Sequence, residues 1–244
     1  MRKKRLKIAV IGYGRFGKLL TQFLLPFGEI NVISKQKIKD KQILKLKYAE
    51  LANMDWIIPA VPISEFENVL KKIRPYLKSG SLVMDICSVK VLPCKLLKKY
   101  IPQNCQILGT HPMFGPDSAK NGLNGLQIVI CPLRISKETL NQVVGVFRKL
   151  KLKIIETSPG NHDKQAARCL GLVHLIGRAL LDMKIKEQPI NTLGFKRLLA
   201  VNETVKNDSW QLFFDMQRFN PYASKTRSEF INSLKSLNEK IKIN

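Results

Sequence analysis

Two short segments carry residue types that can move protons. His111 stands in the run Gly109 to Pro116 (GTHPMFGP), and Ser88 stands in the run Asp85 to Lys90 (DICSVK). Each run follows an apolar stretch that we predict as a strand, so both lie where doubly wound sheets bind ligands. An imidazole held there between glycines and prolines is well suited to act as a general base. The residues alone leave a structural role for His111 equally open.

A glycine-rich loop near the start of the chain predicts a bound dinucleotide. Residues 12–17 read GYGRFG, follow a predicted strand at 7–11 and open a predicted helix at 16–25. The first glycine of this pattern permits a tight turn, the second lets the backbone approach a pyrophosphate, and the third allows close helix–strand packing. A tight turn without a ligand is the alternative. The predicted cofactor-binding residues of the loop are Gly12, Gly14, Arg15, Phe16 and Gly17.

The end of the second predicted strand, residues 30–33, bears on which dinucleotide binds. Enzymes that use NAD usually carry an acid there for the ribose hydroxyls. Here Ser34 and Lys35 follow the strand, and the first acid is Asp40. A hydroxyl and a lysine suit a 2′-phosphate, so we predict NADP as the cofactor, with Ser34 and Lys35 as contacts. The alternative is that Lys35 and Lys37 are only solvated.

The elements that must position these residues alternate along the first part of the chain. Apolar runs predict strands, and helical periodicity predicts helices between them. Such alternation implies right-handed βαβ units and an α/β, Rossmann-type, mostly parallel sheet. The predicted strands are 7–11, 30–33, 56–60, 81–86, a strand that ends at 107–109, 127–131 and 153–156, and the predicted helices are 16–25, 41–51 and 66–77.

The character of the sequence changes after about Thr157. We predict a dinucleotide-binding domain over residues 1–157 and an all-helical domain over 158–244 that serves substrate binding and dimerisation. The first helical segment, 162–183, is apolar on nearly all sides, and in so small a domain this predicts burial between the subunits of a homodimer. The predicted helices of the second domain are 162–183, 197–205, 209–219 and 224–241.

The net charge of the chain indicates which kinds of partner it could bind. The 244 residues include 42 Lys and Arg against 18 Asp and Glu, a net charge of +24. The lysines are spread along the chain and accompany no recognition motif for nucleic acid, so a lysine-rich solvated surface is favoured. A positive field would still attract an anionic cofactor or substrate.

Other features exclude several classes of protein. No run approaches the ~20 apolar residues of a membrane helix. The apolar run after the basic start is too short for a signal peptide, so we expect a cytoplasmic enzyme without a membrane partner. The five cysteines are scattered and none forms a C-x-x-C pair. The sequence therefore favours reduced thiols over a metal site or disulfides.

Several segments in order resemble the prephenate and arogenate dehydrogenases of tyrosine biosynthesis, most closely the short plant-type arogenate enzymes. The resemblance runs from the glycine loop to beyond Trp210, and the long histidine motif is its most specific part. The segments that carry it are Ser88-Val89-Lys90, residues 110–118 (THPMFGPDS) with 120–122, His162-Asp163, His174 with Gly177-Arg178, residues 189–192 with Gly194, and residues 207–209.

The resemblance implies an oxidative decarboxylation of a cyclohexadienol with a ring carboxylate at C1 and a hydroxyl at C4. His111 would accept the proton of that hydroxyl as hydride leaves C4, and Ser88 would hydrogen-bond the hydroxyl or fix the imidazole. Loss of the carboxylate then gives an aromatic ring. The implied catalytic residues are His111 and Ser88, and the implied substrate-binding residues are Thr110, His162, His174, Arg178 and Asp208.

Asp208 favours arogenate as the implied substrate, because plant-type enzymes place an acid there that would pair with the substrate's ammonium group. The stretch at 195–200 (FKRLLA) departs from the arginine-bearing pattern of many prephenate enzymes. Prephenate is the alternative substrate, a helix cap is the alternative role of Asp208, and a subunit-interface salt bridge is the alternative for His174 and Arg178.

Two rival classes of protein have their own signatures. A β-hydroxyacid dehydrogenase or a pyrroline-carboxylate reductase would share the glycine loop but would not need His111 in this motif. A basic nucleic-acid-binding protein would show steeply salt-dependent binding.

Overall fold

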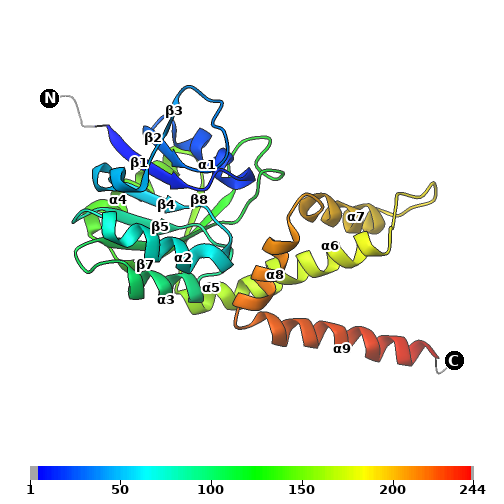
Figure 1. The fold of residues 1–244 in the computed structure, drawn as a ribbon. Coiled ribbons are helices and arrows are strands. Elements are labelled where there is room, and N and C mark those ends of the chain that lie inside the picture. The colour runs from blue at the N-terminus through cyan, green and yellow to red at the C-terminus, as the bar shows by residue number, and fades with distance from the viewer. Residues whose placement is uncertain (1–4, 243–244) are drawn as a thin grey trace. The chain divides into compact units, whose positions relative to one another are not determined.

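The computed structural model describes residues 5–242, and the chain divides into two compact units, Met1–Pro159 and Gly160–Asn244. Figure 1 shows the first unit as a layered α/β unit and the second as a set of helices. None of the helices in the described part of the chain is long and apolar enough to cross a membrane.

The first unit is built on one eight-stranded sheet in the order β3-β2-β1-β4-β5-β6-β7-β8. Neighbouring strands from β3 to β6 are parallel, β7 is antiparallel to β6, and β8 is parallel to β7. The prediction of a mostly parallel, Rossmann-type sheet is confirmed. The strands are β1 (Leu6–Ile11), β2 (Gly28–Ile33), β3 (Ile43–Lys45), β4 (Trp56–Pro59), β5 (Leu82–Asp85), β6 (Gln106–Pro112), β7 (Gln127–Arg134) and β8 (Lys153–Glu156).

Helices cover both faces of this sheet. One face presents side chains such as Ile8 and Val10 to a core that α1 and α4 complete. On the opposite face, Cys94 of α3 packs against Val129 and Cys131 of β7, and α2 packs against α3. The helices are α1 (Arg15–Leu24), α2 (Ile63–Ile73), α3 (Val91–Tyr100) and α4 (Lys137–Lys149), with short 3-10 turns η1 (Tyr48–Asn53) and η2 (Arg74–Tyr76).

One predicted element of this unit is wrong. The segment 41–51, predicted as a helix, forms the edge strand β3 and the start of η1. Ile43 is buried and pairs with Ile30 of β2, and the Leu46 N–H donates to the Val32 carbonyl. The structure also adds two helices, α3 and α4, that the sequence did not predict.

The second unit is helical, as predicted. The segment 162–183 is not one regular helix, because the π-helical turn η3 (Ala167–Gly171) separates α5 (Pro159–Ala166) from α6 (Leu172–Asp182). The Gln217 side chain donates to the Gly171 carbonyl at 2.9 Å, which gives this turn a partner from α8. Figure 1 shows α6 and α7 side by side. The remaining helices are α7 (Leu193–Val205), α8 (Trp210–Phe219) and α9 (Ala223–Lys242).

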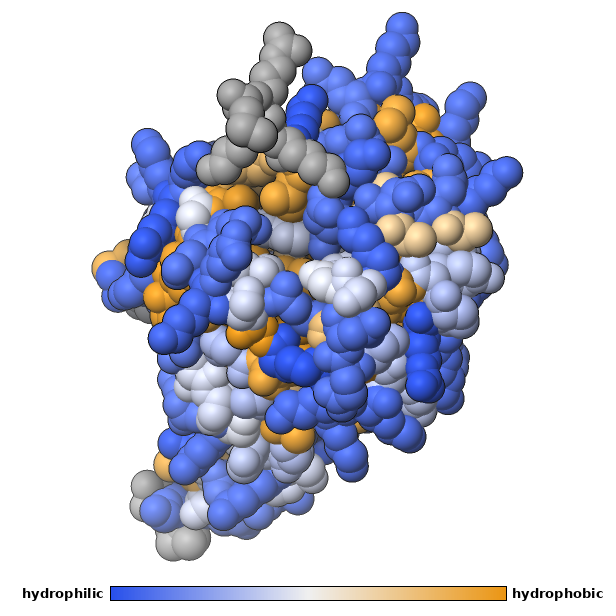
Figure 2. Space-filling view, turned by 90° about the vertical axis from the view of Figure 1, so that its left-hand side faces the viewer, coloured by the Kyte–Doolittle hydropathy of each residue, from blue (hydrophilic) through white to orange (hydrophobic). Residues whose placement is uncertain are grey.

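The surface is rich in charged side chains. Figure 2 shows one face of the molecule, on which hydrophilic residues predominate and hydrophobic ones form small, separate patches. This agrees with the interpretation of the lysines as a solvated surface.

Candidate active site

The cofactor and catalytic residues predicted in the first unit lie at the carboxyl edge of the parallel strands. β1 runs into Gly12, β2 runs into Ser34, and β5 runs into the segment that bears Ser88, while His111 is the next-to-last residue of β6. The strand order turns from β2 on one side of β1 to β4 on the other. Gly12 therefore lies at the topological switch point, where sheets of this kind bind ligands.

The three glycines of the loop are required for different reasons. Gly12 has φ +105°, and a Cβ there would lie 2.3 Å from the Ala60 carbonyl oxygen. A Cβ on Gly17 would lie 2.4 Å from the Gly12 carbonyl oxygen, so this glycine lets α1 approach the loop. A Cβ on Gly14 would have no neighbour within 4 Å among the described residues. The open space at Gly14 is thus available to a ligand, whereas Gly12 and Gly17 avoid clashes within the protein.

The start of α1 has the properties of a phosphate site. Gly14 is the N-cap residue and has no side chain with which to cap the helix. The N–H groups of the first turn and the positive end of the helix dipole suit an anion. The first turn, Arg15 to Lys18, carries basic residues and no acid. The loop therefore fits the pyrophosphate of a dinucleotide.

Arg15 and Phe16 connect the glycine loop to the segment that follows His111. Arg15 Nη2 lies 2.7 Å from Asp117 Oδ2 in a partly exposed ion pair. The rings of Phe16 and Phe114 have centroids 6.3 Å apart. The fold thus brings the predicted cofactor loop and the predicted general-base segment together.

Ser34 and Lys35 occupy the loop after β2. The Gly12 N–H donates to the Ile33 carbonyl at 2.9 Å, which places Ser34 next to the glycine loop. Ser34 Oγ accepts the Gln36 N–H at 2.9 Å, and the Lys35 side chain is exposed. Asp40 lies further on and is bonded to Gln22 and Gln42.

Ser88 and His111 follow closely after the same pair of neighbouring residues on β5 and β6. Asp85 of β5 is paired with Gly109 of β6, and Ser88 and His111 follow these two residues. His111 is 6% exposed. Ser88 Oγ is buried and has no hydrogen-bond partner among the residues that the structure describes. An unsatisfied buried hydroxyl in such a place is typical of a group that meets a ligand or water.

Thr110, predicted as a substrate contact, is almost fully buried and its hydroxyl donates to the Asp85 carbonyl. The Thr110 N–H donates to Asp85 Oδ2 at 3.3 Å, and the Thr110 carbonyl accepts from the Lys90 ammonium. Thr110, the residue before His111, is therefore anchored to β5. The Asp85–Lys90 ion pair was missed as a unit, although an acid at the end of the apolar run SLVMDI, five residues before a lysine, is a signal for it.

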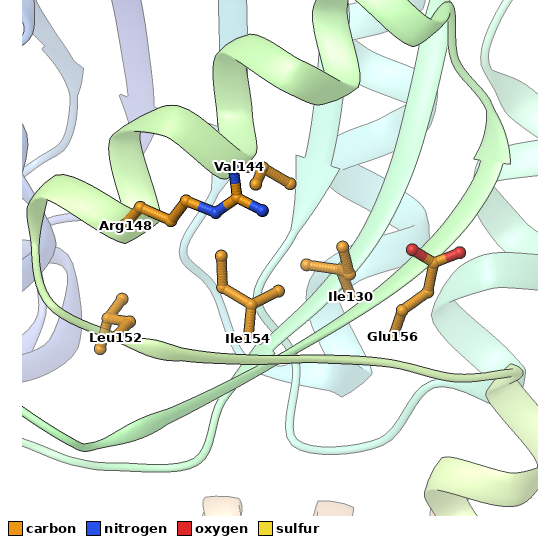
Figure 3. Close-up of a pocket in the computed structure, with 6 residues that line it drawn as sticks. All are labelled: Ile130, Val144, Arg148, Leu152, Ile154 and Glu156. Carbon is orange, nitrogen blue, oxygen red and sulfur yellow. The ribbon is translucent and has the colours of Figure 1, made fainter.

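A hollow of about 380 Å³ lies on the other side of the sheet, between α4 and the last two strands (Figure 3). Ile130, in its floor, belongs to the core that α4 completes, whereas His111 pairs with Val129, whose side chain faces α3. Residues paired across strands share a face and neighbours along a strand alternate. The hollow is therefore not the predicted site. Its lining residues are Ile130, Val144, Arg148, Leu152, Ile154 and Glu156.

In the second unit, His162 and Asp163 form a buried pair near the start of α5. His162 Nδ1 lies 2.8 Å from Asp163 Oδ1. The Asp163 carbonyl accepts from the Asn220 side chain at 2.8 Å, so the turn after α8 is tied to α5. Both residues are thus held within the helical unit, and the carboxylate orients the imidazole.

Three predicted substrate-binding residues, His174, Arg178 and Asp208, lie together in the second unit, although the sequence predicted only that His174 and Arg178 share a helix face. His174 Nε2 lies 3.9 Å from Asp208 Oδ2, and Arg178 Nη2 donates to the Asp208 carbonyl. Burial, and then the charge of Arg178, lower the pKa of His174 to about 4. The imidazole is therefore neutral at pH 7, and its contact with Asp208 is not an ion pair.

Trp210 belongs to this neighbourhood and was not predicted, and neither was Asn202 of the adjacent helix α7. The Arg178 guanidinium lies 4.5 Å from the centroid of the Trp210 ring. His174 Nδ1, Arg178 Nε and Asn202 Oδ1 are buried without hydrogen-bond partners within the described residues. Trp210 follows Asp208 by two residues in the sequence, but only the contact between α6 and the start of α8 shows that its ring covers Arg178.

No group of three or more His, Cys, Asp or Glu side chains in the described part of the chain is arranged to hold a metal ion.

Two family descriptions match the sequence. Residues 32–156 match "Prephenate dehydrogenase, nucleotide-binding domain", and residues 179–244 match "TYRAAT1-like, C-terminal domain". The first match covers about half of the chain and includes Ser88 and His111.

Relatives with curated names are similar over most of the chain. Arogenate dehydrogenase 1, chloroplastic, of Arabidopsis thaliana is 32% identical over 96% of this chain and 39% of its own length. Arogenate dehydrogenase 2, chloroplastic, of the same plant is 31% identical over 89% of this chain and 65% of its own length. The chain therefore spans less than two thirds of either relative.

A solved structure shares the fold at low sequence identity. Prephenate dehydrogenase from A. aeolicus, in complex with hydroxyphenyl propionate and NAD+, superposes with a TM-score of 0.77. The match covers 99% of this chain and 92% of that chain at 19% identity.

Proposed function

Because the chain belongs to the arogenate/prephenate dehydrogenase family, we propose that it catalyses the NADP-dependent oxidative decarboxylation of arogenate to tyrosine. The observation that carries the proposal is the placement of Ser88 and His111 on adjacent strand ends, at the edge where the glycine loop lies.

His111 acts as the general base in this proposal. Its imidazole accepts the proton of the C4 hydroxyl, and Ser88 Oγ, which is buried and without a partner among the described residues, donates to or accepts from the same hydroxyl. The bound nicotinamide would supply the hydride acceptor. Holding the hydroxyl between two fixed side chains contributes by orientation. Loss of the ring carboxylate follows, because the developing carbonyl accepts its electrons.

We assign NADP as the cofactor because of the residues that follow β2. Ser34 and Lys35 provide a hydroxyl and an exposed ammonium group, and an acid is reached only at Asp40. The test is a comparison of the Michaelis constants for NADP and NAD. A clear preference for NAD would remove Ser34 and Lys35 from the assignment.

We assign the substrate's side chain to the cluster of His174, Arg178 and Asp208. Arg178 offers a cation to the side-chain carboxylate, and Asp208 offers a carboxylate to an ammonium group. The neutral His174 adds no positive charge that would repel this ammonium. Prephenate, whose side chain is a keto acid, gives Asp208 nothing to pair with and is the second candidate.

We also propose a homodimer formed through the helical region predicted at 158–244, with the dinucleotide-binding region at 1–157. Support comes from apolar side chains of α6, such as Val173 and Ile176, that are only half-buried within the chain. On α9, exposed apolar residues recur at Ile231, Leu234 and Ile241. Sedimentation that shows a monomer at micromolar concentration would refute the dimer.

The decisive experiment follows NADPH formation with purified arogenate and prephenate side by side, using His111→Ala as the matched control. We expect faster turnover of arogenate and loss of activity in the variant. Faster turnover of prephenate would assign that substrate instead, and a chain inactive with both would refute the proposed activity.

A further inference from the structure

The most deeply buried charges of the first unit are Asp85 and Lys90, which lie at the end of β5 and just before α3. Both side chains are fully buried, and the Lys90 ammonium donates to Asp85 Oδ1. Burial alone would lower the pKa of Lys90, but the carboxylate of Asp85 raises it above its ordinary value. Burial raises the pKa of Asp85 in turn, and the ammonium of Lys90 opposes that rise. Direct contact between the two fully buried side chains therefore fixes the pair in the protein interior.

The pair closes the loop that bears Ser88. Asp85 Oδ1 accepts the Cys87 N–H at 2.9 Å as well as the Lys90 ammonium. One carboxylate thus holds residues on both sides of Ser88. The conformation of this short loop, and the direction of the Ser88 hydroxyl, depend on a group that is not itself near solvent.

The same pair holds the strand end that bears His111. Asp85 Oδ2 accepts the Thr110 N–H at 3.3 Å, and Lys90 donates to the Thr110 carbonyl. The Thr110 hydroxyl donates to the Asp85 carbonyl. Three bonds therefore fix the residue immediately before His111 to the loop that bears Ser88.

We propose that Asp85 and Lys90 are positioning residues that set the geometry of Ser88 relative to His111. Stability alone is a poor reason for such a pair, because apolar replacements of buried ion pairs are often as stable or more so. A buried ion pair does, however, restrict the two segments that it joins, here the Ser88 loop and the end of β6, to one relative arrangement. The role in catalysis rests on the proposed function, whereas the fixed geometry of His111 does not.

The experiment uses the full chain with the double variant Asp85→Asn and Lys90→Met, which removes both charges and leaves neither unpaired. The matched control is Lys95→Met, which removes an exposed lysine from α3, the helix that follows Lys90. The chain has three histidines, so the imidazole signals of His111, His162 and His174 can be resolved by NMR and assigned with His111→Gln.

We expect the double variant to bind NADPH as tightly as the native chain, to lose about 10²-fold in kcat with little change in KM, and to shift or broaden only the His111 imidazole signal. Lys95→Met should match the native chain in all three. An unchanged His111 signal together with native kcat would overturn the proposal, as would equal changes in all three histidine signals.

Two further outcomes are informative. Should the double variant fail to fold, Lys90→Arg keeps both charges of the pair but changes the donor to the Thr110 carbonyl, and it is judged by the same signal of His111. A native chain inactive with both substrates would refute the proposed function, and the His111 signal would then decide the positioning role by itself.

Discussion

Replacing Gly14 by alanine is expected to weaken NADPH binding at least about tenfold, or about 1.4 kcal/mol, while leaving the thermal midpoint of the chain unchanged. The backbone at Gly14 has φ −71°, which alanine adopts without strain. A Cβ there meets no atom of the described residues within 4 Å. The added methyl group therefore disturbs only a ligand whose phosphates approach the start of α1.

The neighbouring glycines should behave in the opposite way. Alanine at Gly12 combines φ +105° with a contact of 2.3 Å to the Ala60 carbonyl oxygen. The backbone strain costs about 1–3 kcal/mol, and the overlap costs about 1–3 kcal/mol more. Alanine at Gly17 also overlaps a carbonyl, but it gains about 1 kcal/mol of helix propensity. Stability should therefore fall most for Gly12→Ala, less for Gly17→Ala and least for Gly14→Ala.

Thermal unfolding and fluorescence titration with NADPH measure the two effects separately. The matched control is Gly145→Ala in α4, where a Cβ also meets no described atom within 4 Å. This control should keep its affinity for NADPH and gain about 1 kcal/mol of stability from helix propensity. If Gly14→Ala binds NADPH like the native chain, the loop does not hold the pyrophosphate. If Gly12→Ala is as stable as the native chain, the argument from strain and overlap is wrong.

Four further outcomes test the remaining assignments. His111→Ala should lower kcat about 10²–10⁴-fold with the NADPH dissociation constant unchanged, and a native rate would remove this residue from the reaction. Asp208→Asn should move the ratio of kcat/KM values for arogenate and prephenate toward prephenate by at least about tenfold; an unchanged ratio would mean that the carboxylate only caps a helix. Because burial lowers the pKa of His174 from 6.5 to about 4, the unfolded chain takes up a proton before the native chain as the pH falls. The free energy of unfolding should then decrease by about 3 kcal/mol between pH 6.5 and 4, and His174→Gln, measured by urea unfolding, should lack this decrease. Gly177→Ala would place its Cβ 2.5 Å from Val205 Cγ2 and should cost about 1–3 kcal/mol, part of which Val205→Ala should restore in the double variant.

The sheet could be predicted from the sequence because its strands are buried on both faces and therefore read as short apolar runs. The predicted helix at 41–51 fails for a physical reason. Ile43 and Leu46 are three residues apart and both buried, which satisfies helical periodicity. A three-residue edge strand followed by a bend buries the same two side chains, and pairing with β2 selects it.

The two helices that were not predicted lack a clear periodic signal or carry misleading residues. Pro93 stands inside α3, but it lies in the first turn, where a missing N–H costs nothing. Gly145 stands in the middle of α4 and weakens its helical pattern, while the Ser136 hydroxyl that caps this helix accepts the Thr139 N–H. Where the local sequence signals for a helix are this weak, packing against the sheet determines whether the helix forms.

The cluster in the second unit shows a different limit. The spacing of His174 and Arg178 predicts a shared helix face, which is a local property. The contact of Arg178 with Asp208 and the Trp210 ring joins α6 to residues some thirty positions further on. Only packing within the helical unit brings them together, so the sequence could name the members through a family resemblance but could not derive their geometry.

Some buried polar groups have all their hydrogen-bond partners within the protein and others do not. This difference distinguishes residues that support the site from residues predicted to act in it. Asp85 and Lys90 form several bonds within the protein and need nothing further. Buried polar atoms without partners are uncommon in native proteins. In the described part of the chain such side-chain atoms belong to Ser88, His174, Arg178 and Asn202. Three of these four residues were predicted as catalytic or substrate-binding from the sequence, where burial and hydrogen bonding could not have influenced the choice. Asp85 and Lys90, which hold the site in place, are therefore satisfied within the protein, whereas Ser88, His174 and Arg178 keep buried polar atoms that a substrate could satisfy.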